Sequence, residues 1–242
     1  MGKGRFGVLL CAEDSDYVRK RYGGIFGVFL GMLTEEGETW DVFRVFSGEL
    51  PEDDDLADYD GFVITGSCRD AHGNDPCISD LCFLLKRLHA LRKRVLGVCF
   101  GHQVLCRALG GKTGRAAGGW DIGVTSVKIL PSASLPAHGI PSSISVIECH
   151  RDEILELPPA AEVLAWSDKT KVEMFKLGDH ILGIQGHPEY NKDILLHLID
   201  RLLHRNLIDV SHADKVKEKL DKDEPHREAW KRLCRSFLKG GL

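Results

Sequence analysis

The sequence predicts an α/β protein with a mixed, mostly parallel open sheet and helices on both faces of that sheet. In the first half of the chain, short apolar runs that are typical of buried strands alternate with longer segments of helical periodicity. Near-continuous apolar strands joined by helices are typical of a parallel sheet that is covered on both sides. After Gly111 the strand candidates follow one another without helices, which indicates antiparallel strands that extend the sheet.

The elements of the first half follow from these apolar runs. We expect strands over 6–11, 40–46, 61–65 and 95–98, with helices from about 15 to 33 and from 79 to 92. Ligands of parallel sheets bind beyond the carboxyl ends of the strands. Gly66, Cys99 and His187 would all lie at that edge.

The second half predicts short strands and then helices. Strand candidates cover 123–130, 144–149, 161–166, 172–177 and 180–185, and 131–145 between them has the composition of a surface loop. The glycine-rich run 110–119 does not complete the pattern of a phosphate-binding loop, because Cys106 stands where that pattern needs its first glycine, so we interpret the run as a helix stop and loop. Asn191 is expected to cap a helix over 194–203.

The C-terminal segment is dense in charge over 215–222 and 224–239. Trp230, Leu233 and Phe237 share one helical face, which favours docking of this helix on its own domain. We therefore expect a catalytic domain over 1–206 and a helical extension over 207–242 that packs on it.

The composition excludes several classes of protein. A chain of 242 residues buries roughly 70 to 75% of its unfolded surface, and the net charge of −4 is spread without a long basic block. We therefore expect no nucleic-acid partner. The chain has no long uninterrupted apolar run, and its first residues match neither a signal peptide nor the myristoylation pattern. We expect no membrane partner and a cytosolic location.

The cysteines predict neither a disulfide scaffold nor a metal site. No Cys-x-x-Cys pair or finger-type histidine pair occurs, and a chain of this length is held together by its core. Apart from Cys99 and Cys68, we interpret them as small apolar residues of a reducing compartment: Cys11, Cys77, Cys82, Cys106, Cys149 and Cys234.

Cys99 is the candidate nucleophile. It stands between Gly97 and Gly101, where the apolar strand 94–98 ends and a helix begins. A strand-to-helix hinge this sharp is typical of a nucleophile elbow, in which flanking glycines leave room for strained backbone. A thiol at a helix N-terminus also faces free N–H groups and the positive end of the helix dipole, and both favour the thiolate.

The segment Gln185 to Glu189 supplies a candidate base and its orienting acid. In extended backbone, residues i and i+2 point to the same side about 6.5 Å apart, so Glu189 is within reach of the outer nitrogen of His187. The carboxylate would hold the imidazole in one tautomer while the other ring nitrogen faces the sulfur.

The two motifs together resemble the class I glutamine amidotransferases, a family with a flavodoxin-like fold. The resemblance implies a Cys-His-Glu triad that hydrolyses the γ-amide of a glutamyl group, without a cofactor or metal. More particularly, the chain looks like the plant cytosolic γ-glutamyl peptidases, which remove glutamate from glutathione conjugates. That likeness extends along almost the whole chain and includes 22–38, 40–45 and 172–175.

The resemblance also implies the remaining site residues. Acyl transfer needs donors for the oxyanion, each worth about 3 to 4 kcal/mol, and we expect them at Phe100 and in the Gly66-Ser67 loop. Cys68 follows that loop where the family usually has proline, so the sequence departs from the family pattern at this position. Three residues resemble the substrate-binding positions of the family: Gln103, His150 and Asp152.

Three functions remain open at this point. The first is a γ-glutamyl peptidase that acts on a small-molecule γ-glutamyl substrate and needs no obligate protein partner. The second is a glutaminase subunit that passes ammonia to a partner synthetase. The third is a catalytically silent binding domain, which the intact triad disfavours.

Overall fold

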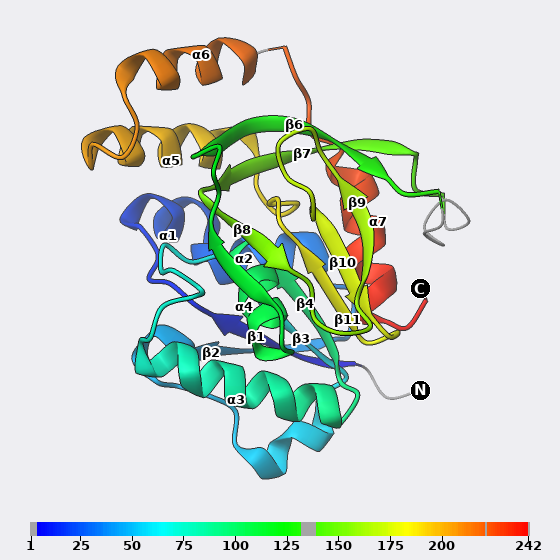
Figure 1. Ribbon diagram of the computed structural model, residues 1–242. Helices are drawn as coiled ribbons and strands as arrows, with labels where there is room; N and C mark the ends of the chain where they lie inside the picture. The colour runs from blue at the N-terminus through cyan, green and yellow to red at the C-terminus, as the bar shows by residue number, and fades with distance from the viewer. Residues whose placement is uncertain (1–3, 132–138, 221, 242) are drawn as a thin grey trace.

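The computed structural model describes residues 4–131, 139–220 and 222–241, which form a nine-stranded sheet flanked by helices (Figure 1). The order of the strands is β2-β1-β3-β4-β11-β10-β9-β6-β7. The first five strands pair in parallel and the others pair antiparallel. The predicted fold class, mostly parallel with an antiparallel extension, is confirmed.

The strands of this sheet are β1 (Arg5–Leu10), β2 (Thr39–Arg44), β3 (Gly61–Ile64), β4 (Arg94–Val98), β6 (Asp121–Ile129), β7 (Ser143–His150), β9 (Glu162–Trp166), β10 (Met174–Leu177) and β11 (Ile181–Ile184). β5 (Lys112–Arg115) and β8 (Asp152–Glu156) form a separate antiparallel pair. The α-helices are α1 (Asp16–Tyr22), α2 (Gly24–Leu33), α3 (Pro76–Ala90), α4 (Phe100–Ala108), α5 (Lys192–His204), α6 (Val210–Leu220) and α7 (Arg227–Leu238).

Apolar side chains on the two faces of the sheet enter two different cores, as the period-2 alternation of strands requires. On β1, Val8 packs with α2 and α7, whereas Leu9 packs with α3 and α4. A third cluster joins α5 and α6 to β6 and β7. The parallel strands β3, β4 and β11 therefore lie buried, with their carboxyl ends at one edge.

The N-terminal helical segment differs from the single predicted helix because Gly23 interrupts it. Gly23 has φ 73° and caps α1, with its amide bonded to the Arg19 carbonyl, and α2 starts at the next residue. The left-handed conformation stops the first helix, which is the common role of glycine after a helix. The predicted N-cap of α5 is confirmed, since the Asn191 side chain accepts from the Ile194 amide at 2.9 Å.

Two loop predictions are wrong in part. Lys112–Arg115 forms β5 within the glycine-rich run, and β7 begins at Ser143 inside the predicted loop 131–145. β5 and its partner β8 are short and polar enough that neither shows a clear strand pattern. Residues 132–138 of that loop lie outside the described residues.

The C-terminal helix α7 packs into the first core, as its apolar stripe predicts. Trp230, Leu233 and Phe237 are all buried there, and the Trp230 indole N–H donates to the Ser145 carbonyl at 3.0 Å. Across the described stretches of the chain, none of the helices combines the length and the apolar character that crossing a bilayer requires.

Replacing Trp230 by alanine is expected to lower the free energy of unfolding by about 3 to 5 kcal/mol, because it removes a fully buried aromatic ring from the core. Urea unfolding followed by circular dichroism measures this change. Arg232→Ala, on the exposed face of the same helix, is the control and should shift stability by less than about 0.5 kcal/mol. Equal stability of the two variants would contradict the structural role of Trp230.

Candidate active site

Cys99 lies at the joint between β4 and α4 in a backbone conformation that side chains rarely adopt. Its φ and ψ angles are 54° and −106°, and its amide donates to the Ile184 carbonyl of the neighbouring strand at 2.9 Å. A Cβ added at Gly97 would lie 2.5 Å from the Gly101 carbonyl oxygen, and one at Gly101 would lie 2.4 Å from the Ile64 carbonyl oxygen. Both glycines therefore permit the sharp turn that the sequence predicts.

His187 and Glu189 form a buried pair just beyond the next strand. β11 runs parallel to β4, with Ile184 opposite Val98, so the chain leaves both strands at the same edge. The His187 Nδ1 and Glu189 Oε1 atoms are 2.8 Å apart, and the two residues are 4% and 1% exposed. The His187 amide also donates to the Ile147 carbonyl at 2.7 Å. The carboxylate fixes the ring and leaves Nε2 for exchange of a proton.

The sequence analysis missed Tyr190, which stacks on the imidazole. The ring centroids of His187 and Tyr190 are 4.1 Å apart and their planes differ by 5°. Tyr190 directly follows the His-Pro-Glu segment, so an aromatic residue next to the motif was the available signal. Glu189 holds the imidazole at one ring nitrogen, and the Tyr190 stack restricts rotation of the ring by covering one of its faces.

The protonation of His187 depends on the two groups beside it. Burial alone would lower its pKa, but the neighbouring Cys99 sulfur and Glu189 carboxylate favour the imidazolium and raise the pKa to about 10. A protonated imidazole beside the sulfur in turn stabilises a thiolate by charge attraction. The arrangement is thus suited to hold a thiolate and imidazolium pair.

Gly66, the predicted oxyanion-loop residue, lies directly against the imidazole. A Cβ at this position would be 2.9 Å from His187 Cε1. Ser67 follows, and its hydroxyl donates to the Cys11 carbonyl at 2.9 Å, which fixes the loop after β3. Phe100 is the first residue of α4 after the sulfur. The structure therefore brings the predicted oxyanion residues to the same edge as Cys99.

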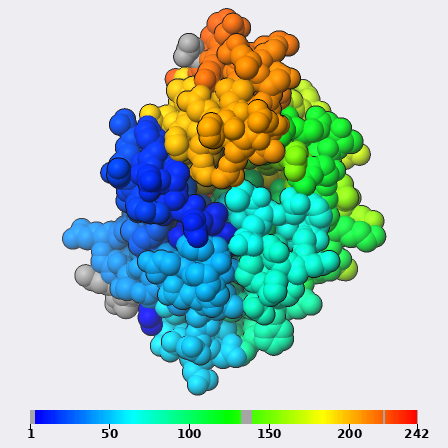
Figure 2. Space-filling model, turned by 90° about the vertical axis from the view of Figure 1, so that its left-hand side faces the viewer, coloured from blue at the N-terminus to red at the C-terminus, as the bar shows by residue number. Residues whose placement is uncertain are grey.

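A cavity of about 310 Å³ opens at this edge between α1, α5 and the 66–70 segment. Figure 2 shows this face, where the blue α1, the gold and orange helices α5 and α6 and the cyan segments border a hollow. Seven of the nine predicted site residues line the cavity: Gly66, Ser67, Cys99, Gln103, His150, Asp152 and His187. Glu189 and Phe100 are buried and do not line the cavity.

The three predicted substrate-binding residues meet at one carbonyl group. The Gln103 amide nitrogen donates to the Asp152 carbonyl oxygen at 2.8 Å, and His150 Nδ1 lies 2.9 Å from the same oxygen. These bonds join α4 to the β7–β8 connection. The amide nitrogen of Gln103 is thus already engaged, and it also donates to the side-chain oxygen of Gln185 at 3.1 Å.

One group of side chains has metal-ligand geometry among the described residues. Ligand atoms of Asp70, His72 and Asp152 lie within 4.8 Å of one another. The Arg115 guanidinium, however, binds the Asp152 carboxylate and lies 3.0 Å from Asp70. Because the Arg115 guanidinium already pairs with both carboxylates, we assign no metal to this group.

Two buried carboxyl groups, which the sequence did not reveal, lie behind the cavity. Glu148 and Glu173 are 0% and 1% exposed, and Glu148 Oε2 is 3.3 Å from His150 Nε2. Burial raises the pKa of both carboxyls well above the ordinary range, and the charge of Asp121 raises it further. Both therefore favour the protonated form.

A thiol on a strained turn, an imidazole beside it and a carboxylate behind that imidazole are the groups that cysteine-dependent hydrolases use. A family model described as glutamine amidotransferase class-I matches residues 17–195. The chain belongs to this family. The expected resemblance is therefore confirmed.

Curated relatives extend the likeness over nearly the whole chain. Gamma-glutamyl peptidase 5 of Arabidopsis thaliana is 50% identical over 240 residues, which cover 98% of this chain and 96% of the relative. Gamma-glutamyl peptidase 3 of the same plant is 47% identical and covers 98% of each chain.

Solved structures agree on the fold. A glutamine amidotransferase of Thermotoga maritima superposes with a TM-score of 0.75 at 20% identity and covers 99% of this chain and all of its own. A glutamine amidotransferase of Methylobacillus flagellatus superposes with a TM-score of 0.73 at 19% identity. The superposition covers 100% of this chain and 96% of the other protein. At such identities the likeness concerns the fold alone.

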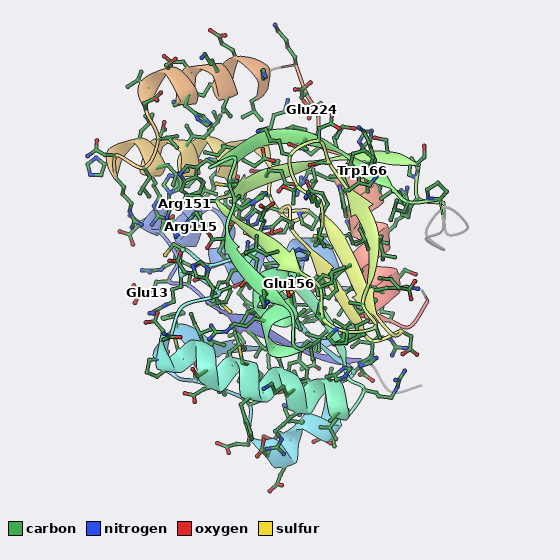
Figure 3. The ribbon with its side chains drawn as sticks, viewed as in Figure 1. Glu13, Arg115, Arg151, Glu156, Trp166 and Glu224 are labelled. Atoms are coloured by element: carbon green, nitrogen blue, oxygen red, sulfur yellow. The ribbon has the colours of Figure 1, made fainter. Side chains whose placement is uncertain are left out.

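Replacing Glu189 by glutamine is expected to lower the pKa of His187, because a neutral amide no longer favours the imidazolium. NMR titration of the His187 ring in the two proteins measures the change. Glu156→Gln is the control, since this exposed residue of β8, labelled in Figure 3, pairs with Lys112 instead. A His187 pKa that is the same in E189Q and wild type would contradict the assigned pairing.

Proposed function

We propose that the protein is a γ-glutamyl peptidase that hydrolyses the γ-glutamyl amide bond of glutathione or glutathione conjugates and releases glutamate. The observation on which the proposal depends is that Cys99 and His187 line one cavity while Glu189 holds the imidazole from behind. The full-length likeness to proteins named gamma-glutamyl peptidases supports this substrate class.

In the proposed reaction, the Cys99 thiolate attacks the γ-carbonyl carbon and the electron pair of the carbonyl moves to its oxygen. The tetrahedral intermediate then collapses, and the leaving amine takes the proton of His187. A water molecule gives a proton back to His187 as it attacks the thioester, which releases glutamate and restores the thiolate. Glu189 keeps the imidazole oriented throughout. Thiol, imidazole and water account for every proton and electron pair, so these steps use no cofactor or metal.

The oxyanion of the intermediate needs donors aimed at it. We assign this role to the backbone N–H of Phe100, next to the sulfur, and to the loop of Gly66 and Ser67. The contact between Gly66 and the imidazole supports the assignment, because it puts this loop beside the reacting groups. One such donor is worth about 3 to 4 kcal/mol of transition-state stabilisation.

The two sides of the cavity suit the two halves of the substrate. Gln103, His150 and Asp152 form a polar side, which we assign to the amino and carboxylate groups of the γ-glutamyl moiety. Apolar residues of the helices form another part of the lining: Val18, Ile25, Ile194, Leu198 and Leu202. The Trp120 indole also lines the cavity and lies beside Arg151, whose guanidinium carbon is 5.5 Å from the ring centroid. An apolar wall supports a leaving group with an apolar body, such as a glutathione conjugate.

The same proposal covers the organisation and location of the chain. We assign catalysis to residues 1–206 and a supporting role to 207–242, because α7 fills the core under β4. We also assign the protein to the cytosol, and the eight free thiols support a reducing compartment.

Cys99→Ala is expected to abolish release of glutamate from glutathione and its conjugates while the protein remains folded, because alanine lacks a nucleophile but fills the same turn. Free glutamate is measured with purified protein, and circular dichroism checks the fold. Cys106→Ala, another buried thiol of α4, is the matched control and should retain turnover. Substantial turnover in C99A would remove Cys99 as the nucleophile.

The same assay decides between the two enzymatic functions. A peptidase releases glutamate from glutathione at a rate far above ammonia release from glutamine. Preference for glutamine, with ammonia release that depends on an added synthetase, would instead favour a glutaminase subunit.

Gly66→Ala is expected to reduce kcat about 100-fold, because the new methyl group would displace an imidazole that Glu189 and Tyr190 hold in place. Steady-state kinetics with glutathione measures the loss. Gly31→Ala is the control, since a Cβ there meets no atom within 4 Å and alanine favours the helix. Normal kcat in G66A would contradict the proposed place of this loop.

A further inference from the structure

Five arginines line the cavity, and they differ in whether an acid neutralises them. Arg69 pairs with Asp75 at 2.6 Å, and Arg115 pairs with Asp70 at 3.0 Å. Within the described part of the chain, no carboxylate lies within 4.0 Å of the other three guanidinium groups, which belong to Arg151, Arg201 and Arg205.

The acids of α5 itself are engaged elsewhere. Asp193 lies 3.1 Å from Arg21 and accepts hydrogen bonds from two tyrosine hydroxyls, while Asp200 binds Lys217 of α6 at 2.8 Å. Arg201 lies in the last turn of α5 and Arg205 is the residue that caps this end of the helix, and both line the cavity. This helix therefore presents two positive charges, without an acid of its own, to the cavity.

Arg201 lines the same cavity as His187 and Tyr190. Burial raises the pKa of the Tyr190 phenol, and the positive charge of Arg201 opposes that increase. Tyr190 stacks on His187. Long side chains of a helix lean toward its N-terminus. For α5 this is the end that follows His187 in the chain, so the guanidinium leans toward the site.

The position of Arg201 along the cavity indicates which group of the substrate its guanidinium contacts. Gln103, His150 and Asp152 occupy the polar side of the cavity, whereas Arg201 lies beyond the apolar residues Ile194 and Leu198 of α5. A leaving dipeptide extends about 7 Å from the scissile nitrogen. An arginine side chain can therefore reach the far end of the dipeptide across the apolar residues. A carboxylate at the end of that dipeptide matches an unpaired guanidinium in charge and geometry.

We propose that Arg201, assisted by Arg205, binds the terminal carboxylate of the leaving peptide and so selects γ-glutamyl peptides over γ-glutamyl compounds that lack this carboxylate. This inference rests on the proposed peptidase function and adds a specificity-determining residue to it. The two helical arginines form a subsite for an anionic leaving group, separate from the polar side that receives the glutamyl moiety.

The test compares two substrates that differ only in this group, glutathione and glutathione amidated at its glycine carboxylate. kcat and KM are measured for wild type, Arg201→Met, Arg201→Lys and Arg205→Met by following free glutamate. Methionine keeps an unbranched apolar stem but removes the charge. Arg232→Met, an exposed arginine of α7 outside the cavity, is the matched control.

Wild type is expected to prefer glutathione over the amide by about 10-fold or more in kcat/KM. R201M should raise KM for glutathione by about 10-fold, with kcat nearly unchanged, and should leave kcat/KM for the amide within about 2-fold. R201K should retain part of the preference for glutathione over the amide. R205M should show a smaller increase in KM for glutathione than R201M, and R232M should have the same kcat and KM as wild type.

Equal loss on both substrates in R201M would overturn the inference, because it would place Arg201 at the glutamyl moiety or in the structure. Equal kcat/KM of wild type for acid and amide would overturn it without any variant. In both cases release of glutamate from the peptides would still support the peptidase function. Release of glutamate from neither peptide, with activity on glutamine, would instead mean that the proposed function has failed.

Discussion

The strained backbone at Cys99 is the constraint on which the rest of the site depends. A left-handed φ of 54° at a side-chain-bearing residue costs free energy, and it persists only where the surroundings fix it. Here the Cys99 amide is bonded to the Ile184 carbonyl, and Gly97 and Gly101 allow the strand, the helix and the adjacent strand to approach closely. The turn exposes the sulfur at the end of β4, and the parallel pairing of β4 and β11 brings the imidazole to the same edge.

The polar interior behind the cavity shows how the antiparallel half of the sheet supports this edge. The Ile147 carbonyl of β7 accepts a hydrogen bond from the His187 amide. The next residue of β7, Glu148, packs against the backbone of Gly186, which directly precedes His187. A Cβ at Gly186 would lie 2.5 Å from Glu148 Oε1, so only glycine lets this carboxyl and the His187 segment approach so closely. The buried Glu148 carboxyl, which lies 3.3 Å from the His150 ring, thus links the substrate side of the cavity to the segment that carries the imidazole.

Much of the fold followed from the sequence because most strands of the large sheet are buried apolar runs, which periodicity detects. The elbow and the His-Pro-Glu segment were also predictable, since glycine spacing and an i, i+2 pair encode local geometry. β5 and β8 were missed because a short, polar strand pair has no such pattern. Tyr190, Glu148 and Arg201 were missed for a different reason. Their roles depend on neighbours that only the folded chain supplies.

Helix α5 connects the chemistry to the choice of substrate. It begins two residues after Tyr190, with Asn191 as its N-cap, so its first turn is attached to the segment that holds His187. Asp193 in that turn binds Tyr17 and Tyr22, which fixes α5 to α1 across the cavity. Because a helix transmits position over its whole length, the cationic residues near its far end keep a constant distance from the imidazole. A leaving group held at that end would therefore set the register of the scissile bond over the sulfur, which is the condition for efficient attack.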